Sequence, residues 1–503
     1  MEKKQEQTPI SKDLAVNLQI LEDRLVFKKN FDLILREIVV GGRRAALLSV
    51  DAFVKDEPMT LIYQELSRIE PGEISLNTFK KLFYRYIIFG EVKQIKTIEE
   101  FINWALSGPV ALMIDGEELG IAIDVRQYPA RAPEEPDLEK VTRGSRDGFI
   151  ETLVHNTALI RRRIRDPRLR MEHLSAGARS KTDIALAYIE NIANPDIIDS
   201  VREKINKINI DGLPMAEKSI EELITPGTYW NPYPKVRYTE RPDVAAAHLL
   251  DGNVMILVDT SPSAIILPTT IFHHLQHAEE FRQNPTVGIY MRWVRYIGVL
   301  ISLFLTPLWL LTVLEPGLLP GPLHFIGPQK PGEIPIFIQF VLAEIAIDMI
   351  RMATIHTPSP IATSTGIIGA VLLGQLAAAV GLFSPEVTLY TAAAAIGTFL
   401  TPSFELAQAN RLARFFILIL TGLFRLPGFI IGVVATFALL LFTRSFGVPY
   451  LWPLIPFNWE AFKSVFMRPP VPTQNLRPSI LKPIDPDRQP QPVPARKPFL
   501  RKR

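Results

Sequence analysis

The side chains best placed to do chemistry in this sequence are three ionisable residues inside an otherwise apolar stretch. Glu344, Asp348 and Arg351 lie within residues 336–355 at spacings of four and three, so an α-helix carries them on one face. An ionisable group in the middle of a bilayer costs at least a few kcal/mol, and we therefore expect this face to avoid lipid. Two interpretations stay open: an Asp348–Arg351 pair that locks helices together, or an ion or proton path through Glu344 and Asp348.

Small and uncharged polar residues mark the next two apolar runs. Gln375 lies among Gly and Ala in one run, while Thr391 and Thr398, seven residues apart, share a helical face in the other. These three side chains are candidates to line a water-filled pore, although a buried interhelical hydrogen bond explains them nearly as well.

The run that holds Gln375 also has a small residue at every fourth position. These residues are Gly366, Ala370, Gly374 and Ala378. Such spacing predicts a groove that admits another helix, within one subunit or between subunits.

The local signatures of several enzyme classes are absent from the sequence. It contains no Gly-rich phosphate loop, no His-Glu-x-x-His helix and no Gly-x-Ser-x-Gly turn. The lack of cysteine excludes disulfides, thiolate metal sites and cysteine nucleophiles. His273, His274 and His277 could ligate a metal, but the polar face of a short helix explains them more simply. We expect no enzyme, no cofactor and no metal site.

The elements that must position the intramembrane residues are apolar runs long enough to cross a bilayer. The five runs cover residues 293–314, 336–355, 363–383, 387–404 and 412–442. Arg292 and Arg295 precede the first run, and basic residues crowd the C-terminal tail. Because positive charge marks the cytoplasmic side, both ends are expected there, which requires an even number of crossings. We expect the last run to be broken or re-entrant at Arg425-Leu426-Pro427-Gly428, where Pro and Gly interrupt helical hydrogen bonding.

Before these runs, strand and helix patterns alternate. Residues 45–50 and 110–114 read as strands and residues 98–105 as a helix. Residues 108–115 are echoed by residues 252–259, and each segment leads into a second apolar strand, as in a β-hairpin. The echo is short, so true duplication and chance similarity both stay open.

The expected fold class is an α/β (α+β) cytosolic region of two similar subdomains followed by an α-helical multi-span membrane domain. The expected segments are a disordered N-terminus (1–25), subdomain 1 (26–135), subdomain 2 (144–288), a transmembrane domain (289–455) and a disordered, Pro-rich basic tail (456–503).

The most basic stretch lies early in subdomain 2, within residues 159–170. It holds Arg161, Arg162, Arg163 and Arg165. As a helix this stretch would carry arginines on several faces. One interpretation is a solvated or subunit-contacting helix with local acid pairs, and the other is a site for anionic lipid or an acidic partner. A net charge of only +3 gives no electrostatic case for nucleic acid.

Several segments together resemble the A subunits of the GerA-type spore germination receptors. They are residues 159–164, 179–183, 231–244, 254–259 and 366–374. The resemblance implies a two-part cytosolic region, a helical membrane domain and residence in the spore inner membrane, where the family forms oligomeric ion channels. Implied partners are further copies of the chain, with a pentamer among the forms, membrane lipids, ions and another integral membrane germination subunit.

Two departures from the receptor pattern stand out. Receptor A subunits usually have Glu-Leu-Leu-Arg-Glu-Ala before a Pro-x-Pro turn, whereas this chain has Asp348-Met349-Ile350-Arg351-Met352-Ala353 and lacks the second acid. Val258-Asp259-Thr260-Ser261-Pro262 replaces the usual Asp-Gly-Thr-Pro turn. Both departures favour an accessory branch of the family over a nutrient receptor. A non-conducting scaffold and a carrier with a midplane site around Glu344 and Asp348 are the alternatives to a channel.

Overall fold

A computed structural model divides the chain into two compact units. Unit 1 comprises Met1–Pro226, Tyr238–Pro268 and Pro470–Arg503, and unit 2 comprises Gly227–Arg237 and Thr269–Pro469. The structure describes residues 7–54, 56–88, 91–128, 139, 141–225, 227, 229–329, 332–356 and 380–489.

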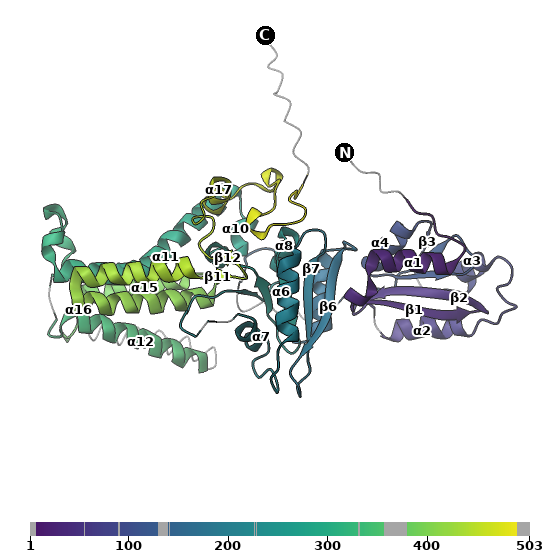
Figure 1. The fold of residues 1–503 in the computed structure, drawn as a ribbon, viewed down its shortest axis with the longest axis horizontal. Coiled ribbons are helices and arrows are strands. Elements are labelled where there is room, and N and C mark those ends of the chain that lie inside the picture. Colours follow the sequence, from purple (N-terminus) through teal and green to yellow (C-terminus); the bar gives the residue numbers. More distant parts are fainter. Residues whose placement is uncertain are drawn as a thin grey trace, which may run out of the picture. The chain divides into compact units, whose positions relative to one another are not determined.

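The first half of unit 1 is a five-stranded antiparallel sheet with helices on it (Figure 1). Its strand order is β1-β2-β4-β5-β3. The strands are β1 (Leu33–Val40), β2 (Arg43–Val50), β3 (Val92–Ile95), β4 (Val110–Ile114) and β5 (Gly120–Ile123), and the helices are α1 (Leu14–Leu25), α2 (Asp56–Ser67), α3 (Thr78–Lys81) and α4 (Ile98–Leu106). Strand β4 is buried along its whole length, because helices cover this sheet on both sides.

The second half repeats this arrangement with the order β6-β7-β9-β10-β8. The strands are β6 (Leu169–Ala176), β7 (Thr182–Ile189), β8 (Arg237–Thr239), β9 (Val254–Val258) and β10 (Ala264–Leu267), and the helices are α5 (Leu153–Arg163), α6 (Pro195–Asn206), α7 (Ala216–Ile224) and α8 (Pro242–Asp251). Helices and strands follow one another in the same sequence in both halves. The predicted hairpins are confirmed as β4–β5 and β9–β10.

Equivalent side chains make equivalent hydrogen bonds in the two halves. The carboxylate of Asp115 accepts from the backbone N–H of Leu14 (3.0 Å), and that of Asp259 accepts from Leu153 (3.0 Å). Each acid follows the first strand of its hairpin and caps the first helix of its half. The short sequence echo therefore belongs to a structural repeat that extends over both subdomains.

Two segments expected to be disordered are ordered where the structure describes them. Helix α1 lies within residues 1–25, and its Leu14, Leu21 and Leu25 are buried in the core of the first sheet. The apolar spacing of three to four residues explains this helix, so the prediction of a disordered N-terminus was wrong from Leu14 onward.

The tail was expected to be disordered from residue 456. Instead it contains α17 (Trp459–Phe466), and further along Leu481 is buried in unit 1. There the N–H of Ile484 donates to the carbonyl of Ile192 (3.0 Å). Packing of a few apolar residues between the prolines orders this segment, although its Pro-rich composition is typical of a disordered chain.

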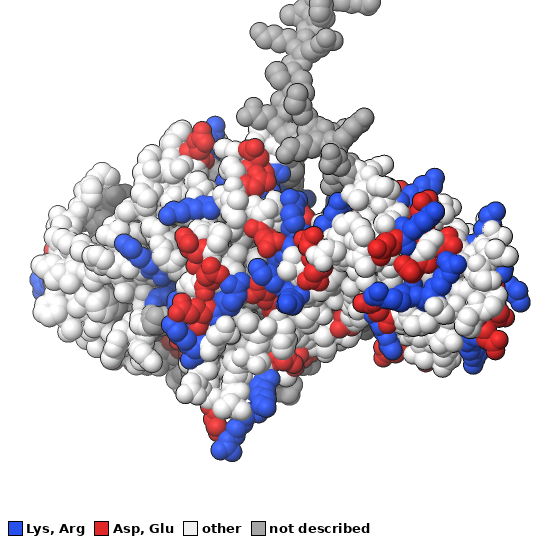
Figure 2. Space-filling view, turned by 45° about the vertical axis from the view of Figure 1, so that its right-hand side comes forward, with Lys and Arg blue, Asp and Glu red and all other residues white. Residues whose placement is uncertain are grey.

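The core of unit 2 is a helix bundle (Figure 1). Its main helices are α11 (Pro285–Leu314), α12 (Ile336–His356), α15 (Pro385–Phe399) and α16 (Phe404–Phe442), preceded by the short helices α9 (Ile271–His274) and α10 (Ala278–Arg282). By length and composition, α11 and α16 can cross a membrane. Most of the expected run 363–383 lies outside the described residues. Figure 2 shows charged side chains crowding the centre and right of the view, while the left, where the helices lie, is mostly uncharged.

Helix α16 is two helices folded back on each other. Arg425 has a left-handed φ of 54°, and a Cβ added to Gly428 would collide with the backbone oxygen of Leu420. A Cβ on Gly432 would lie 3.1 Å from the Cα of Ile417. Residues fifteen apart in a straight helix are separated by about 22 Å, so the chain must reverse at Arg425. The break predicted at this position is confirmed.

The reversal determines where the bundle begins and ends. Tyr296 near the start of α11 and Leu440 near the end of α16 belong to one cluster, together with Tyr233 and Tyr450. At the opposite end the N–H of Leu426 contacts the carboxylate of Glu315, just beyond α11 (3.4 Å). The described bundle therefore starts and finishes at the same end, which we name the entry end.

Candidate functional site

Charged side chains from two helices meet inside the bundle. They are Glu344, Asp348 and Arg351 of α12 and Arg411 and Arg414 of α16. The 21 residues of α12 extend about 31 Å, close to the thickness of a bilayer's hydrocarbon core. Glu344 and Asp348 lie near its middle, so the cluster is placed at the depth where charge is most expensive.

Two ion pairs join α12 to the first half of α16. Arg414 Nη2 donates to Glu344 Oε2 at 2.7 Å, and both side chains are almost completely buried. One turn away, Arg411 Nη1 lies 2.6 Å from Asp348 Oδ1. This second pair is less enclosed, with 38% of the Asp348 side chain exposed. The two pairs follow the register of antiparallel helices, since the residue number rises on one helix as it falls on the other.

Arg414 connects the main helices to one another. Its Nη1 donates to the backbone oxygen of Ser302 on α11 (2.6 Å) and to the hydroxyl of Thr398 on α15 (3.3 Å). Together with the bond to Glu344 on α12, one guanidinium thus contacts three other helices. The N–H groups of a guanidinium donate hydrogen bonds to buried oxygen atoms. An apolar side chain at the same position has no such donors.

One of the two open interpretations paired Asp348 with Arg351 on the same helix. In the structure Asp348 forms its ion pair with Arg411 of α16. The guanidinium of Arg351 lies 5.4 Å from the centre of the Phe399 ring on α15, a cation–π distance. Arg411 was missed because it lies just ahead of the run that begins at residue 412, and Arg414, inside that run, was not singled out. Their spacing of three nearly matches the spacing of four between the acids, and this was the available signal.

The predicted pore-lining residues have different outcomes. Thr398 is buried, donates to the backbone oxygen of Ala394 (3.0 Å) and accepts from Arg414, as in the hydrogen-bond interpretation. Thr391 is buried too, so within one chain neither threonine lines an open surface. Gln375 and the small-residue positions Gly366, Ala370, Gly374 and Ala378 lie outside the described residues.

The expected basic patch of unit 1 is divided between the surface and the interior, and its Arg162 and Arg165 are exposed. Arg161 is fully buried and forms a bidentate ion pair with Asp32, at 2.7 and 3.0 Å. The guanidinium of Arg162 lies 4.4 Å from the centre of the Tyr128 ring, and Arg163 pairs with an acid at 2.9 Å. Asp32 and Tyr128, which contact Arg161 and Arg162, both come from the first half of unit 1. The stretch also does not continue as a helix, since α5 ends at Arg163 and β6 follows.

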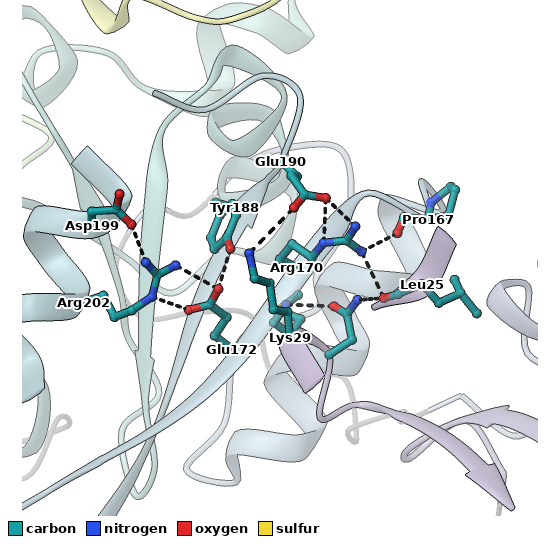
Figure 3. A network of polar contacts seen from close by, with 11 residues as sticks. Leu25, Lys29, Pro167, Arg170, Glu172, Tyr188, Glu190, Asp199 and Arg202 are labelled. Carbon is teal, nitrogen blue, oxygen red and sulfur yellow. Dashed lines mark hydrogen bonds and ion pairs between the residues drawn. The ribbon is translucent and has the colours of Figure 1, made fainter. Parts of the chain in front are cut away.

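Polar contacts hold the two halves of unit 1 together (Figure 3). Arg170, at the start of β6, donates to the backbone oxygen of Leu25 at the end of α1 (3.0 Å) and pairs with Glu190. Lys29 from the first half lies 3.8 Å from the same carboxylate. Two N–H groups of Arg170, on Nε and Nη2, donate to the same oxygen of Glu190, Oε2. The two halves are therefore joined by specific contacts. The Arg161–Asp32 pair is buried, whereas Glu190 and Lys29 are partly exposed.

Beside this junction, a second network lies entirely in the second half. Arg202 of α6 contacts Glu172 of β6 at 2.8 and 2.9 Å, and the hydroxyl of Tyr188 donates to the same carboxylate. Burial, followed by the bond to Glu172, raises the pKa of Tyr188 well above its usual value. The phenol is a fixed hydrogen-bond donor here.

The histidines serve as structural groups in the bundle's connecting segment. His277 accepts from the N–H of Glu279 and caps α10, and His274 lies between Thr269 and Ser403. Burial lowers the pKa of His273 to about 4, so its ring is neutral at pH 7. Among the described residues no group of three His, Asp or Glu side chains could hold a metal ion.

Comparisons with known proteins find relatives over most of the chain. Residues 22–480 match the family model described as Bacillus/Clostridium GerA spore germination protein. Stage V sporulation protein AF of Bacillus subtilis (strain 168) is 46% identical over 487 residues, covering 97% of this chain and 99% of that protein. Spore germination protein B1 of the same organism is 30% identical and covers 95% and 99%.

One solved structure is also similar. It is the N-terminal domain of the A subunit of the Bacillus megaterium spore germinant receptor GerK3, with 23% sequence identity, 52% of this chain and 97% of that chain covered, and a TM-score of 0.41. The match of the family model over most of the sequence is the deciding result. The chain belongs to the GerA family of spore germination proteins.

Proposed function

We propose that this chain is a subunit of a homo-oligomeric ion channel in the spore inner membrane that releases ions during germination. The apolar helices α11 and α16 and the germination relatives indicate a membrane protein. A relative that is 46% identical over nearly the full length is named a stage V sporulation protein. This similarity favours an accessory protein that amplifies germination over a nutrient receptor, and we propose no catalytic activity.

The observation that carries the proposal is the exposure of Asp348. More than a third of this side chain is uncovered in the single chain, although it lies near the middle of α12. One carboxylate oxygen is buried beside Arg411, but the exposed remainder of an acidic side chain at that depth is strongly disfavoured in contact with lipid. In the membrane this exposed part is stabilised by water or by a polar group of another copy. A polar path between copies supplies either one.

The neighbouring residues of α12 define the direction of this path. Ile345 and Met349 are exposed and apolar, as a lipid-facing surface requires, while Glu344 faces inward to Arg414. Asp348 lies at the border between these faces. Copies arranged around an axis would bring one Asp348 each toward the shared path, with Arg411 beside it.

The entry end is proposed to face the spore core, together with unit 1. The exposed basic residues Arg444 and Lys463 lie at this end, as the positive-inside rule requires. We also propose that the chain associates with another integral membrane germination subunit and with membrane lipids, as its resemblance to the receptors implies.

Reconstitution in planar bilayers separates the channel from its alternatives. Unitary current steps indicate a channel, saturable flux without steps indicates a carrier with a midplane site around Glu344 and Asp348, and no flux indicates a scaffold. In a channel, Asp348→Asn should change unitary conductance or ion preference. Met349→Leu on the outer face is the matched control and should change neither. Unaltered currents in Asp348→Asn, with the oligomer intact on native gels, would exclude this residue from the path.

A further inference from the structure

Exposed aromatic side chains gather at the entry end of unit 2. They are Tyr229, Trp230, Tyr290, Trp293, Phe457 and Trp459, and we name them the aromatic rim. Tyr229 and Trp230 are almost completely exposed, at 98% and 95%. Large aromatic groups normally bury their surface, so a set of six at one end of a bundle requires an explanation.

The Tyr229-Trp230 segment is held at the level where the apolar helix ends. Asn231 Nδ2 donates to the hydroxyl of Thr443, the residue that ends α16, at 2.7 Å. Two residues further on, Tyr233 is buried against Tyr450. The backbone is thus fixed to the end of α16, while the two preceding aromatic side chains point into free space.

The segment before α17 carries a second part of the rim. Residues 454–459 read Leu-Ile-Pro-Phe-Asn-Trp, and the Leu, Ile, Phe and Trp side chains are all exposed. Helix α17 is nevertheless firmly attached, because Arg292 Nη1 donates to the carbonyls of Ser464 and Val465 at 3.0 and 2.8 Å. Its Phe466 ring packs edge-on against Tyr296 of α11 (5.2 Å). Exposure here therefore accompanies a fixed backbone.

The rim continues the outer surface of the helices. On α11, exposed apolar residues recur at Val287, Tyr290, Val294 and Ile297, the spacing of one helical face. In a membrane protein this stripe faces lipid, and Tyr290 and Trp293 lie at its beginning. Tyr and Trp favour this depth, where the ring contacts acyl chains and the polar group contacts the head groups.

The charge of the same region fits anionic head groups. Arg444 follows directly after α16, and Lys463 is exposed on α17. Glu460 is the exposed acid beside them, so these three side chains leave an excess of positive charge. Exposed Lys and Arg at a membrane surface attract anionic lipid.

We propose that the aromatic rim is a lipid-contact surface seated in the head-group layer, with α17 lying in the plane of the interface. The basic residues Arg444 and Lys463 bind anionic head groups there. The surface fixes the depth of the bundle and attaches its connecting segments to the membrane. This inference holds whether or not the bundle conducts ions.

The absence of native cysteine allows a direct test with the full-length protein in vesicles of zwitterionic and anionic phospholipids. Trp230→Cys and Phe457→Cys variants carry an environment-sensitive fluorophore, and spin-labelled lipids quench it. Amphipathic helices in the interface are buried about 5 to 10 Å into the head-group boundary. Quenching should therefore be stronger with the spin label near the head group than with the label near the chain end.

Leu76→Cys and Met215→Cys are matched controls, because these apolar side chains are similarly exposed but belong to unit 1. Their fluorescence should be insensitive to either lipid. Quenching at positions 230 and 457 that is no stronger than at the controls would overturn the proposal. So would disulfide formation between copies of the unlabelled Phe457→Cys variant together with protection of the labelled variant from lipid quenching, because this result would assign the surface to a second copy of the chain.

Lys463→Gln combined with Arg444→Gln tests the electrostatic part. Both substitutions are made in the labelled Phe457→Cys protein, which is the parent protein of this comparison. In vesicles that contain anionic lipid, the double substitution should remove part of the quenching at position 457. In purely zwitterionic vesicles, quenching should equal that of the parent protein. Equal quenching in both lipid mixtures for the parent protein would refute anionic head-group binding.

Discussion

Replacing Arg414 by methionine should destabilise the helix bundle strongly. The substitution leaves the carboxylate of Glu344 enclosed without its cation, since both side chains are almost completely buried. Removing one partner of a buried ion pair costs about 3 to 5 kcal/mol. The acceptors at Ser302 and Thr398, each bonded to Arg414, lose a donor as well, so the upper part of this range is expected.

The double variant Glu344→Met with Arg414→Met separates the cost of an unpaired charge from the value of the pair. A buried pair replaced by apolar groups of similar volume often leaves stability unchanged or higher. We therefore expect the double variant to regain most of the stability that Arg414→Met loses. The coupling between the two positions should amount to about 2 to 3 kcal/mol.

Thermal unfolding in detergent micelles measures these differences. For a unit of about 200 residues, 1 kcal/mol shifts the melting midpoint by about 2 to 4 °C, so Arg414→Met should melt about 6 to 20 °C lower. The tryptophan fluorescence of Trp309 reports on the same bundle, where its ring packs against Phe340 of α12.

Arg411→Met is the control, and it should melt closer to the parent protein because its partner Asp348 is partly exposed. The single variant Glu344→Met completes the comparison. If the stability losses of Glu344→Met and Arg414→Met simply add in the double variant, the pair contributes no coupling and the reasoning fails.

Five further variants, two of them controls, test other parts of the structure. Gly432→Leu should cost about 1 to 3 kcal/mol, because its side chain meets the other half of the α16 hairpin, whereas Gly317→Ala, with open space around it, should melt like the parent protein. Arg161→Met should increase hydrogen exchange in the surrounding strands and cost about 3 to 5 kcal/mol, whereas the exposed Arg165→Met should stay within about 0.5 kcal/mol. Burial raises the pKa of Asp251 from 3.8 to about 6, so the fold binds the proton more tightly than the unfolded chain. The melting midpoint should then fall as the pH rises through this interval, and Asp251→Asn should remove that dependence.

The sequence by itself determined the elements whose signals are local. Alternating and continuous apolar runs located the hairpins, and residues 98–105 coincide with most of α4 (Ile98–Leu106). Arg425-Leu426-Pro427-Gly428 revealed the break in the last run, because Pro and Gly change backbone hydrogen bonding at their own positions. The spacing of Glu344 and Asp348 correctly placed both acids on α12, since helical periodicity depends only on distance along the chain.

Only the tertiary structure decided which charges meet. Arg414 pairs with Glu344 across 70 positions of the chain, and Arg161 pairs with Asp32 across 129. Spacing shows which side chains share a face of one helix, but it does not show which other element that face contacts. The partner of Asp348 therefore lies on α16 and not within its own helix. Arg161 belongs to a stretch of arginines that composition assigns to the surface, yet it is buried because the other subdomain supplies Asp32. Burial and pairing depend on the packing of distant elements, and this packing is specified by the whole fold.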